Sequence, residues 1–255
     1  MEKIKKIILK VPFSIFIYRT LKKTINFPGY IRDIIVYSSK QKNRFPIRWT
    51  SLLPYLEDKT PRTNFEPHYI YHPAWAMRVI SKINPTKHID ISSTISFGAA
   101  LSAFIPVDFY DYRPAEINLS NLNSLKGDLL SLPFKDNSVE SISCMHTVEH
   151  VGLGRYGDPI DPDGDIKAIN ELKRVTKVGG NLIFVSPIGK PKLEFNAHRI
   201  YSYDQVIKYF EGMQMVEFSL VPDDYRKRGF IINASKTDAD SQTWGCGCFW
   251  FKKIK

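Results

Sequence analysis

Apolar residues along the middle of the chain alternate between strand-like runs and helical spacing. Val139–Met145 is a short apolar run with β-branched residues, which predicts a buried strand. Apolar positions then recur at helical spacing over residues 166–176, and Gly179 and Gly180 end this predicted helix before another apolar run at 181–185. A strand, a helix and a second strand in this order form a βαβ unit, which implies a parallel sheet.

The same alternation continues on both sides of this unit. The first strand and its exit loop are predicted at residues 87–93, and further strands at 106–111, 122–126, 214–221 and 244–251. Helices are predicted at 97–104 and at 203–210, the latter with Ser202 as its N-cap, and Pro73 is predicted as the first residue of the helix that begins the body. We therefore expect an α/β domain with a mostly parallel sheet over residues 74–255.

Two polar segments follow the predicted central strands. Residues 145–158 come directly after one strand, and residues 187–199 come after the next. Ligands of open α/β sheets bind beyond the carboxyl ends of the strands. We therefore expect these two segments to form the mouth of a site.

Composition indicates one ordinary domain with an appendage. The chain has 255 residues, of which 43% are hydrophobic, so it can bury a substantial core. Its three cysteines, Cys144, Cys246 and Cys248, form no disulfide framework, which favours a reducing cytoplasm as the location.

No metal site is expected from sequence spacing. Cys246 and Cys248 are too close for a zinc knuckle, and the acidic run at 161–165 lacks the glutamate that completes a calcium loop. His68 and His72 flank the entry to the first helix of the body, but the sequence identifies no partners that would complete a metal site. A structural or substrate-lining role is expected for this pair.

The net charge of +10 is concentrated at the N-terminus. Residues 1–48 contain 12 of the 36 Lys and Arg residues and 2 of the 26 acidic residues, so the rest of the chain is neutral. Basic and apolar clusters alternate in this segment, which we interpret as a basic amphipathic helical arm. A proline-rich stretch follows, and residues 49–73 are expected to form a connector that packs on the body.

Two interpretations of the arm stay open. Its apolar runs fall short of the roughly 18 residues that span a bilayer, and no cleavage site of the signal-peptide type follows them. The arm either lies on an anionic membrane surface, which would place the protein peripherally at the inner face, or packs on the body with a solvated basic face. Nucleic acid is not an expected partner, because no recognised binding motif is present. The sequence does not indicate the oligomeric state.

Several short motifs resemble those of class I S-adenosylmethionine-dependent methyltransferases. They are Asp90 and Asp111 at the ends of the first two strands, Gly127-Asp128 after the third, Glu149-His150 after the fourth, and Gly179-Gly180. The resemblance covers roughly residues 74–255. It implies a three-layer, Rossmann-like fold with seven strands, the last of which (244–251) lies antiparallel beside the fifth. It also implies S-adenosylmethionine as cofactor, with the ribose at Asp111 and the adenine near Asp128.

A closer resemblance is to a domain family of unknown function. The residues that carry it include His68-Tyr69, His88-Ile89-Asp90, the run from Glu149 to Asp158, and the run from Glu194 to Arg199. Members of that family are methyltransferase-like and often accompany surface-polysaccharide genes. The resemblance therefore implies a role in the assembly of surface glycans.

The loop after the first strand departs from the methyltransferase pattern. That pattern is D-x-G-x-G-x-G, in which glycine lets the backbone approach the cofactor and adopt positive φ. Here residues 90–96 read Asp-Ile-Ser-Ser-Thr-Ile-Ser. Either the loop runs differently, or the cofactor is not bound in the usual way. The residues expected to bind the cofactor are Asp90, Ser92, Ser93, Asp111 and Asp128.

The loops at the predicted mouth carry the groups expected to perform chemistry. A histidine beside a carboxylate suits general base catalysis on a hydroxyl, and arginine can hold phosphate or carboxylate with two hydrogen bonds. The catalytic candidates are His146, Glu149, His150, Asp158 and His198. The substrate-binding candidates are Arg155, Tyr156, Asn196 and Arg199.

Three functions fit these residues. The first is a methyltransferase for a sugar, nucleotide sugar or glycan, with His146 or His198 as the base. The second is a sugar-nucleotide isomerase or mutase that uses the same fold without S-adenosylmethionine, and the missing glycines motivate it. The third is a non-enzymatic, membrane-associated module of a glycan-synthesis complex, and the basic arm motivates it.

Overall fold

The computed structural model describes residues 12–42 and 44–254, with side chains described from residue 20 onwards. The chain divides into two compact units, Met1–Asn64 and Phe65–Lys255. The second unit begins inside the predicted connector, and the expected boundary at residue 74 lies within its first helix.

The described residues of the first unit form one long helix, α2 (Pro12–Lys40), and a short 3₁₀ turn, η1 (Trp49–Ser51). The segment after the helix is held against it, because Asn26 donates a hydrogen bond to the Leu56 carbonyl oxygen (2.6 Å) and Lys59 pairs with Asp33 (3.3 Å). The structure thus confirms a helix over most of the predicted arm, while residues 1–11 lie outside the described part. Among the helices described, none is long and apolar enough to span a membrane.

The second unit is built on one seven-stranded sheet. Its strands are β1 (His88–Ile91), β2 (Val107–Asp111), β3 (Leu122–Lys126), β4 (Val139–Met145), β5 (Thr176–Ile188), β8 (Met213–Val221) and β9 (Gly245–Lys253). They lie in the order β3-β2-β1-β4-β5-β9-β8. Neighbours from β3 to β5 pair in parallel, and β9 is antiparallel to both β5 and β8. This confirms the predicted three-layer fold and its inserted last strand.

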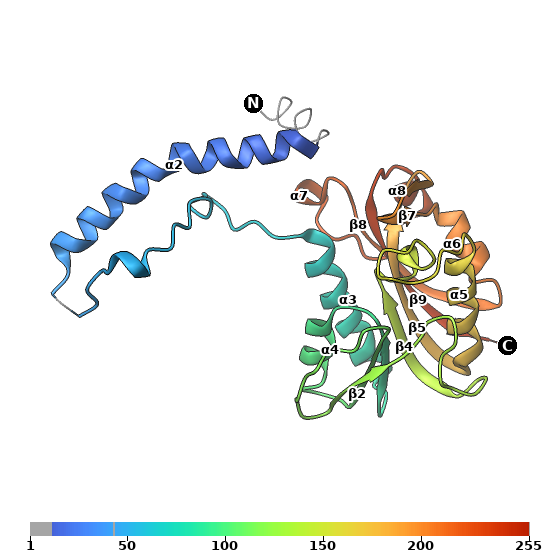
Figure 1. The fold of residues 1–255 in the computed structure, drawn as a ribbon. Helices are drawn as coiled ribbons and strands as arrows, with labels where there is room; N and C mark the ends of the chain where they lie inside the picture. Colours follow the sequence, from blue (N-terminus) through green and yellow to red (C-terminus); the bar gives the residue numbers. More distant parts are fainter. Residues whose placement is uncertain (1–11, 43, 255) are drawn as a thin grey trace. The chain divides into compact units, whose positions relative to one another are not determined.

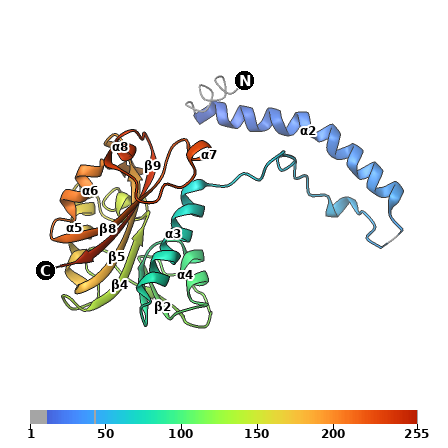
Figure 2. The ribbon, with the colours of Figure 1, turned by 180° about the vertical axis from the view of Figure 1, so that it is seen from behind.

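Helices cover both faces of the sheet (Figures 1 and 2). One face carries α3 (Pro67–Ile83) and α4 (Ile95–Leu101), whose core includes Trp75 and Phe97. The other carries α5 (Gly164–Val175) and α6 (Tyr203–Tyr209), whose core includes Leu172 and Phe210. Shorter elements are η2 (Val148–His150), β6 (Lys192–Glu194), β7 (His198–Ile200), α7 (Tyr225–Arg228) and α8 (Lys236–Asp240).

The first helix of the body begins earlier than predicted. Pro67, and not Pro73, is its first residue, and Pro73 lies inside the helix. An interior proline removes one backbone hydrogen bond and costs about 3 kcal/mol. Burial of the apolar side chains that follow Pro73 in the helix, among them Trp75, Val79 and Ile80, offsets this cost. Tertiary packing therefore outweighs the local helix-breaking tendency.

The glycine pair at 179–180 does not separate helix from strand as predicted. Strand β5 begins at Thr176 directly after α5, and the glycines lie within the strand beside an irregularity in its pairing with β4. Gly179 has φ of +80°, and a Cβ on Gly180 would lie 2.8 Å from the Lys177 carbonyl oxygen. The pair therefore permits a bulge in a continuous strand.

Candidate functional site

A cavity of about 410 Å³ opens at the carboxyl ends of β1, β2 and β4, where the strand order predicted a ligand. Eight of the predicted site residues line it, namely Ser92, Ser93, Asp111, Asp128, His146, His150, Tyr156 and Asp158. The other six do not, and these are Asp90, Glu149, Arg155, Asn196, His198 and Arg199. A ligand in the cavity could therefore touch the first eight residues, whereas the other six lie outside the cavity lining.

The serine-rich loop after β1 keeps a left-handed turn without glycine. Ser92 has φ of +52°, a conformation that glycine adopts with less strain than other residues. Its backbone N–H donates to the Tyr110 carbonyl oxygen (2.7 Å), and its hydroxyl group donates to the same oxygen (3.2 Å). The hydroxyl of Ser93 donates to Asp90 (2.7 Å) and accepts from the Met145 N–H (3.1 Å). Both hydroxyl groups are thus bonded within the protein.

Asp90 lies beneath this loop and is fully buried. Its carboxyl group accepts hydrogen bonds from the Ser93 N–H (3.2 Å), from the Ser93 hydroxyl and from the Ser143 hydroxyl. Burial raises its pKa to about 7, although these hydrogen bonds act in the opposite direction. Asp90 therefore anchors the loop between β1 and β4 and does not itself line the cavity.

Two carboxylates line the cavity beyond β2 and β3. Asp111 Oδ1 accepts a hydrogen bond from the Arg113 N–H (2.7 Å), and Asp128 Oδ1 accepts one from the Leu130 N–H (2.9 Å). Gly127 precedes Asp128, and a Cβ on this glycine would lie 3.0 Å from the Tyr110 ring. Glycine thus permits close packing here, and each carboxylate keeps a second oxygen that can accept from a ligand.

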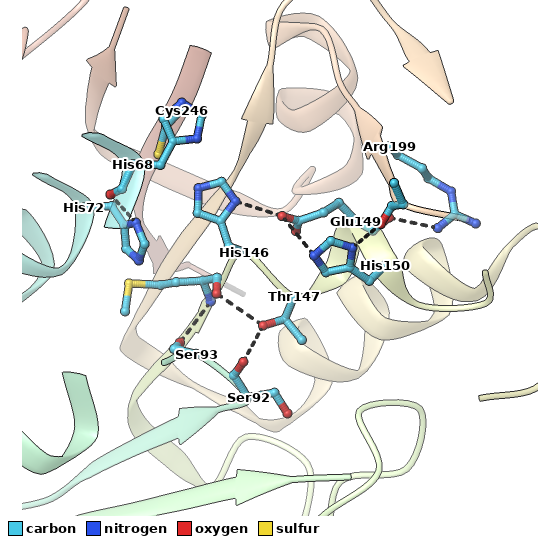
Figure 3. A network of polar contacts seen from close by, with 12 residues as sticks. His68, His72, Ser92, Ser93, His146, Thr147, Glu149, His150, Arg199 and Cys246 are labelled. Atoms are coloured by element: carbon cyan, nitrogen blue, oxygen red, sulfur yellow. Dashed lines mark hydrogen bonds and ion pairs between the residues drawn. The ribbon is translucent and has the colours of Figure 1, made fainter. Parts of the chain in front are cut away.

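Glu149 lies between two histidines near the base of the cavity (Figure 3). Its Oε1 is 2.8 Å from His146 Nδ1 and 3.8 Å from His150 Nε2, and its side chain is only 1% exposed. Burial acts to lower the pKa of His146, but Cys246 and the Glu149 carboxylate outweigh burial and raise it. Glu149 therefore orients the His146 ring by a hydrogen bond and does not itself line the cavity.

His150 presents a neutral ring to the cavity. Its Nδ1 lies 2.6 Å from the Ala197 carbonyl oxygen, a contact that needs a proton on Nδ1 and leaves the lone pair on Nε2. Arg155 Nη1 lies 3.2 Å from the same nitrogen and donates to the Ala197 oxygen (3.0 Å). Burial lowers the pKa of His150, and the opposing effects of Glu149 and the Ala197 carbonyl are smaller. The ring meets that of Tyr156 edge-to-face, with centroids 5.6 Å apart. Tyr156 in turn is flanked by the guanidinium groups of Arg113 (4.8 Å) and Arg155 (5.1 Å).

Asp158 holds the loop after β4 together. Its carboxylate accepts hydrogen bonds from the backbone N–H groups of Gly152 (2.8 Å), Gly154 (3.3 Å) and Tyr156 (3.1 Å). Burial acts to raise its pKa, but these hydrogen bonds outweigh it and the pKa is lowered. Gly152 has φ of +79°, and a Cβ there would lie 2.0 Å from the Asp161 carbonyl oxygen. Asp158 is therefore an ionised anchor at the edge of the cavity.

The predicted residues of the 194–199 segment lie outside the cavity. Arg199 donates to the carbonyl oxygens of Val151 (2.7 Å) and Pro162 (3.2 Å), so it stabilises the loop after β4. His198 stacks on Trp244 with ring centroids 5.9 Å apart. Asn196 is exposed between β6 and β7.

The structure adds cavity-lining residues that were given no role from sequence. Tyr69 on α3 lines the cavity, and burial raises its pKa to about 12. Thr147 also lines it and donates a hydrogen bond to the Ser92 carbonyl oxygen (2.8 Å). Tyr69 belongs to the motif that carries the resemblance to the family of unknown function, and this was the available signal. For Thr147 the available signal was its place in the 145–158 segment, which was expected to form the mouth of the site.

Comparison by sequence gives a partial match. Residues 132–237 match the family described as Caenorhabditis protein of unknown function, DUF268. An uncharacterized protein of Methanocaldococcus jannaschii is 32% identical over 109 residues, which is 39% of this chain. The match spans 43% of that archaeal protein, which is less than half of its length.

Comparison by structure identifies the fold. The N-methyltransferase NodS of Bradyrhizobium japonicum, solved with S-adenosyl-L-homocysteine, superposes with a TM-score of 0.51 at 14% identity, over 75% of this chain and 90% of that one. The 1,6-didemethyltoxoflavin-N1-methyltransferase of Burkholderia thailandensis was solved with bound 1,6-didemethyltoxoflavin and S-adenosylhomocysteine. It superposes with a TM-score of 0.51 at 10% identity, over 72% of this chain and 79% of that one. The chain therefore has the fold of the class I S-adenosylmethionine-dependent methyltransferases.

Proposed function

We propose that this chain is a methyltransferase that binds S-adenosylmethionine in the cavity beyond β1, β2 and β4. The observation that carries the proposal is the joint placement of the Ser92 turn and two carboxylates, Asp111 and Asp128, around one cavity of about 410 Å³. When bound, S-adenosylmethionine supplies an electrophilic methyl group. The cavity volume is within the range of about 300–1,000 Å³ that is usual for small-molecule sites.

The residues present fit this cofactor. The Asp111 carboxylate would accept from the ribose hydroxyl groups, and Asp128 with Leu129 would border the adenine. The backbone of residues 92–94 would border the methionyl part, because the hydroxyl groups of Ser92 and Ser93 are already bonded within the protein. The missing glycines motivated a cofactor-independent isomerase or mutase. The left-handed turn at Ser92 supports the cofactor-dependent activity instead.

The rim of the cavity favours a polar acceptor. His150 has a neutral ring on the cavity wall and can remove a proton from a hydroxyl group. The guanidinium groups of Arg113 and Arg155 lie within about 5 Å of the Tyr156 ring centroid (4.8 and 5.1 Å), where they would attract an anionic acceptor. We therefore propose a sugar, and specifically a nucleotide sugar used in glycan assembly, as the acceptor class.

Calorimetry with the full chain tests cofactor binding. S-adenosylmethionine and S-adenosylhomocysteine should each bind at one site, and the Asp111→Asn variant should bind them more weakly. Asp161→Asn is the matched control, because Asp161 is a partly buried acid that pairs with Lys167 and does not line the cavity. Absence of binding to the wild-type chain would overturn the proposal. Mass spectrometry of nucleotide sugars incubated with protein and cofactor would then identify any acceptor that gains a methyl group.

We also propose that the arm, residues 1–48, contacts an anionic membrane surface. Among its described residues, helix α2 exposes large apolar side chains together with lysines and arginines. The exposed apolar residues include Leu21, Ile25, Ile31 and Ile35. Such a combination is typical of helices that lie on anionic bilayers. The arm would then hold the enzyme near membrane-linked acceptors.

A further inference from the structure

A second cluster of side chains lies behind the wall of the cavity, where α3, the loop after β4 and β9 meet. His68, His146 and Cys246 each place a nitrogen or sulfur atom there, and these atoms lie within 4.8 Å of one another. The His68 residue is 6% exposed, the His146 side chain is 5% exposed and Cys246 is fully buried. Figure 3 shows the His146 ring between Glu149 on one side and His68 with Cys246 on the other.

The His146 ring has one satisfied and one unsatisfied nitrogen. Nδ1 is hydrogen-bonded to Glu149 Oε1 (2.8 Å), whereas Nε2 is buried and has no hydrogen-bond partner among the described residues. Buried polar groups are nearly always paired, because an unpaired one loses its hydrogen bonds to water without replacement. A histidine that binds a metal through one nitrogen usually donates the other N–H to a carboxylate or carbonyl. His146 has this arrangement.

His72 repeats the pattern one turn further along α3. Its Nδ1 lies 2.6 Å from the His68 carbonyl oxygen, which leaves Nε2 as the lone-pair nitrogen, and Nε2 is buried without a partner among the described residues. The ring centroids of His72 and His146 are 5.1 Å apart. Two buried imidazole nitrogens without partners therefore lie beside the same cluster.

We propose that His68, His146 and Cys246 bind a zinc ion. Two imidazole nitrogens and a cysteine sulfur suit zinc, whereas calcium and magnesium require oxygen ligands. The fourth tetrahedral position would be filled by water or by His72. Cys246 binds as the thiolate and His146 binds through a deprotonated Nε2, so the protons of both groups are released to solvent on binding. The ion would satisfy Nε2 of His146.

The zinc ion would join three parts of the chain that are distant in sequence. His68 belongs to α3, His146 follows β4, and Cys246 lies in β9. Because Tyr69 and His146 also line the cavity, the ion would fix one wall of it. The site contains none of the residues proposed to hold S-adenosylmethionine, so zinc binding can be measured without cofactor.

The experiment uses the full-length chain and zinc itself. Protein stripped with a chelator and dialysed should take up about one zinc ion per chain, measured by inductively coupled plasma mass spectrometry. A hundredfold excess of free zinc over its Kd should raise the thermal midpoint by roughly 5–10 °C. Cobalt in place of zinc should give an intense near-ultraviolet thiolate-to-metal band, which needs no variant to interpret.

Two variants and a matched control locate the ion. Cys246→Ser and His146→Gln should lose stoichiometric zinc and the cobalt band. Cys144→Ser should keep both, because Cys144 is equally buried but packs on the α5 face of the sheet. The proposal is overturned if the stripped wild-type chain binds no zinc, or if Cys246→Ser binds it as well as the wild type does.

Discussion

The hydroxyl group of Thr147 donates a hydrogen bond to the carbonyl oxygen of Ser92 (2.8 Å), which ties the loop after β4 to the loop after β1. The same loops are also joined by the Met145 N–H, which donates to the Ser93 hydroxyl (3.1 Å). Together these bonds hold Ser92 at positive φ. The surrounding structure therefore imposes the turn that glycine would otherwise adopt at little cost.

Substitution of Ser92 tests this account of the turn. Ser92→Gly should change the free energy of unfolding by no more than about 1 kcal/mol, because relief of strain offsets the greater entropy of the unfolded chain. Ser92→Val should destabilise by about 1–3 kcal/mol, because a β-branched residue is strained at positive φ. Urea denaturation measures both. Equal stability of the two variants would show that the turn is unstrained or absent.

Asp90 should make stability depend on pH. Burial raises its folded-state pKa to about 7, so the folded protein binds a proton that the unfolded chain has already lost. The stabilisation that results from this raised pKa is fully present below the unfolded pKa near 4. It is lost as the pH rises through the folded pKa of about 7. Between pH 5 and 6, the wild type should lose stability relative to Asp90→Asn by about 1.4 kcal/mol per pH unit, and the slope should fall to about half of this at pH 7. Urea denaturation at several pH values measures the difference, and a constant difference would contradict the prediction.

The strands at the centre of the sheet were the most predictable part of the fold. Val139–Met145 and Leu122–Lys126 match the predicted bounds, because buried strands have distinctive apolar runs bounded by turn residues. The start of α3 was predicted too late, because burial of Trp75 and its apolar neighbours outweighs the helix-breaking tendency of Pro73. They also missed the hairpin of β6 and β7, whose residues read as a polar loop.

The site was predictable at its strand ends and not beyond them. Asp111 and Asp128 line the cavity because parallel strands end at one edge of the sheet. The roles of Asp90 and Asp158 differ from those expected, because hydrogen bonds to neighbouring residues occupy their carboxyl groups. The contact of His68 with His146 and Cys246 joins segments far apart in sequence, so no local spacing could indicate it.

Asp111 should contribute to cofactor affinity through hydrogen bonds to a charged group. Each such bond contributes about 1.5–3 kcal/mol, so Asp111→Asn should weaken S-adenosylhomocysteine binding by about 10- to 100-fold. Calorimetry at constant ionic strength measures the change. Asp161→Asn should leave affinity unchanged, and equal losses in both variants would indicate a general effect of charge.

The arm should bind anionic vesicles. Vesicles that contain phosphatidylserine should sediment together with the full chain. They should bind much less of a chain that lacks residues 1–48, because this deletion removes both the basic charge and the exposed apolar residues of α2. Vesicles of neutral phosphatidylcholine are the control for charge. Undiminished binding after the deletion would contradict the prediction.

His150 should act in catalysis and not in cofactor binding. With an acceptor identified, His150→Gln should lower kcat by about 10²- to 10⁴-fold, because glutamine cannot accept the proton from a hydroxyl group. S-adenosylmethionine affinity should stay within about twofold, since a difference of that size is under 0.5 kcal/mol. His198→Gln is the matched control, because His198 stacks on Trp244 outside the cavity. If His150→Gln and His198→Gln lose kcat equally, the loss does not identify His150 as the base. If kcat is unchanged in His150→Gln, His150 is excluded as the base.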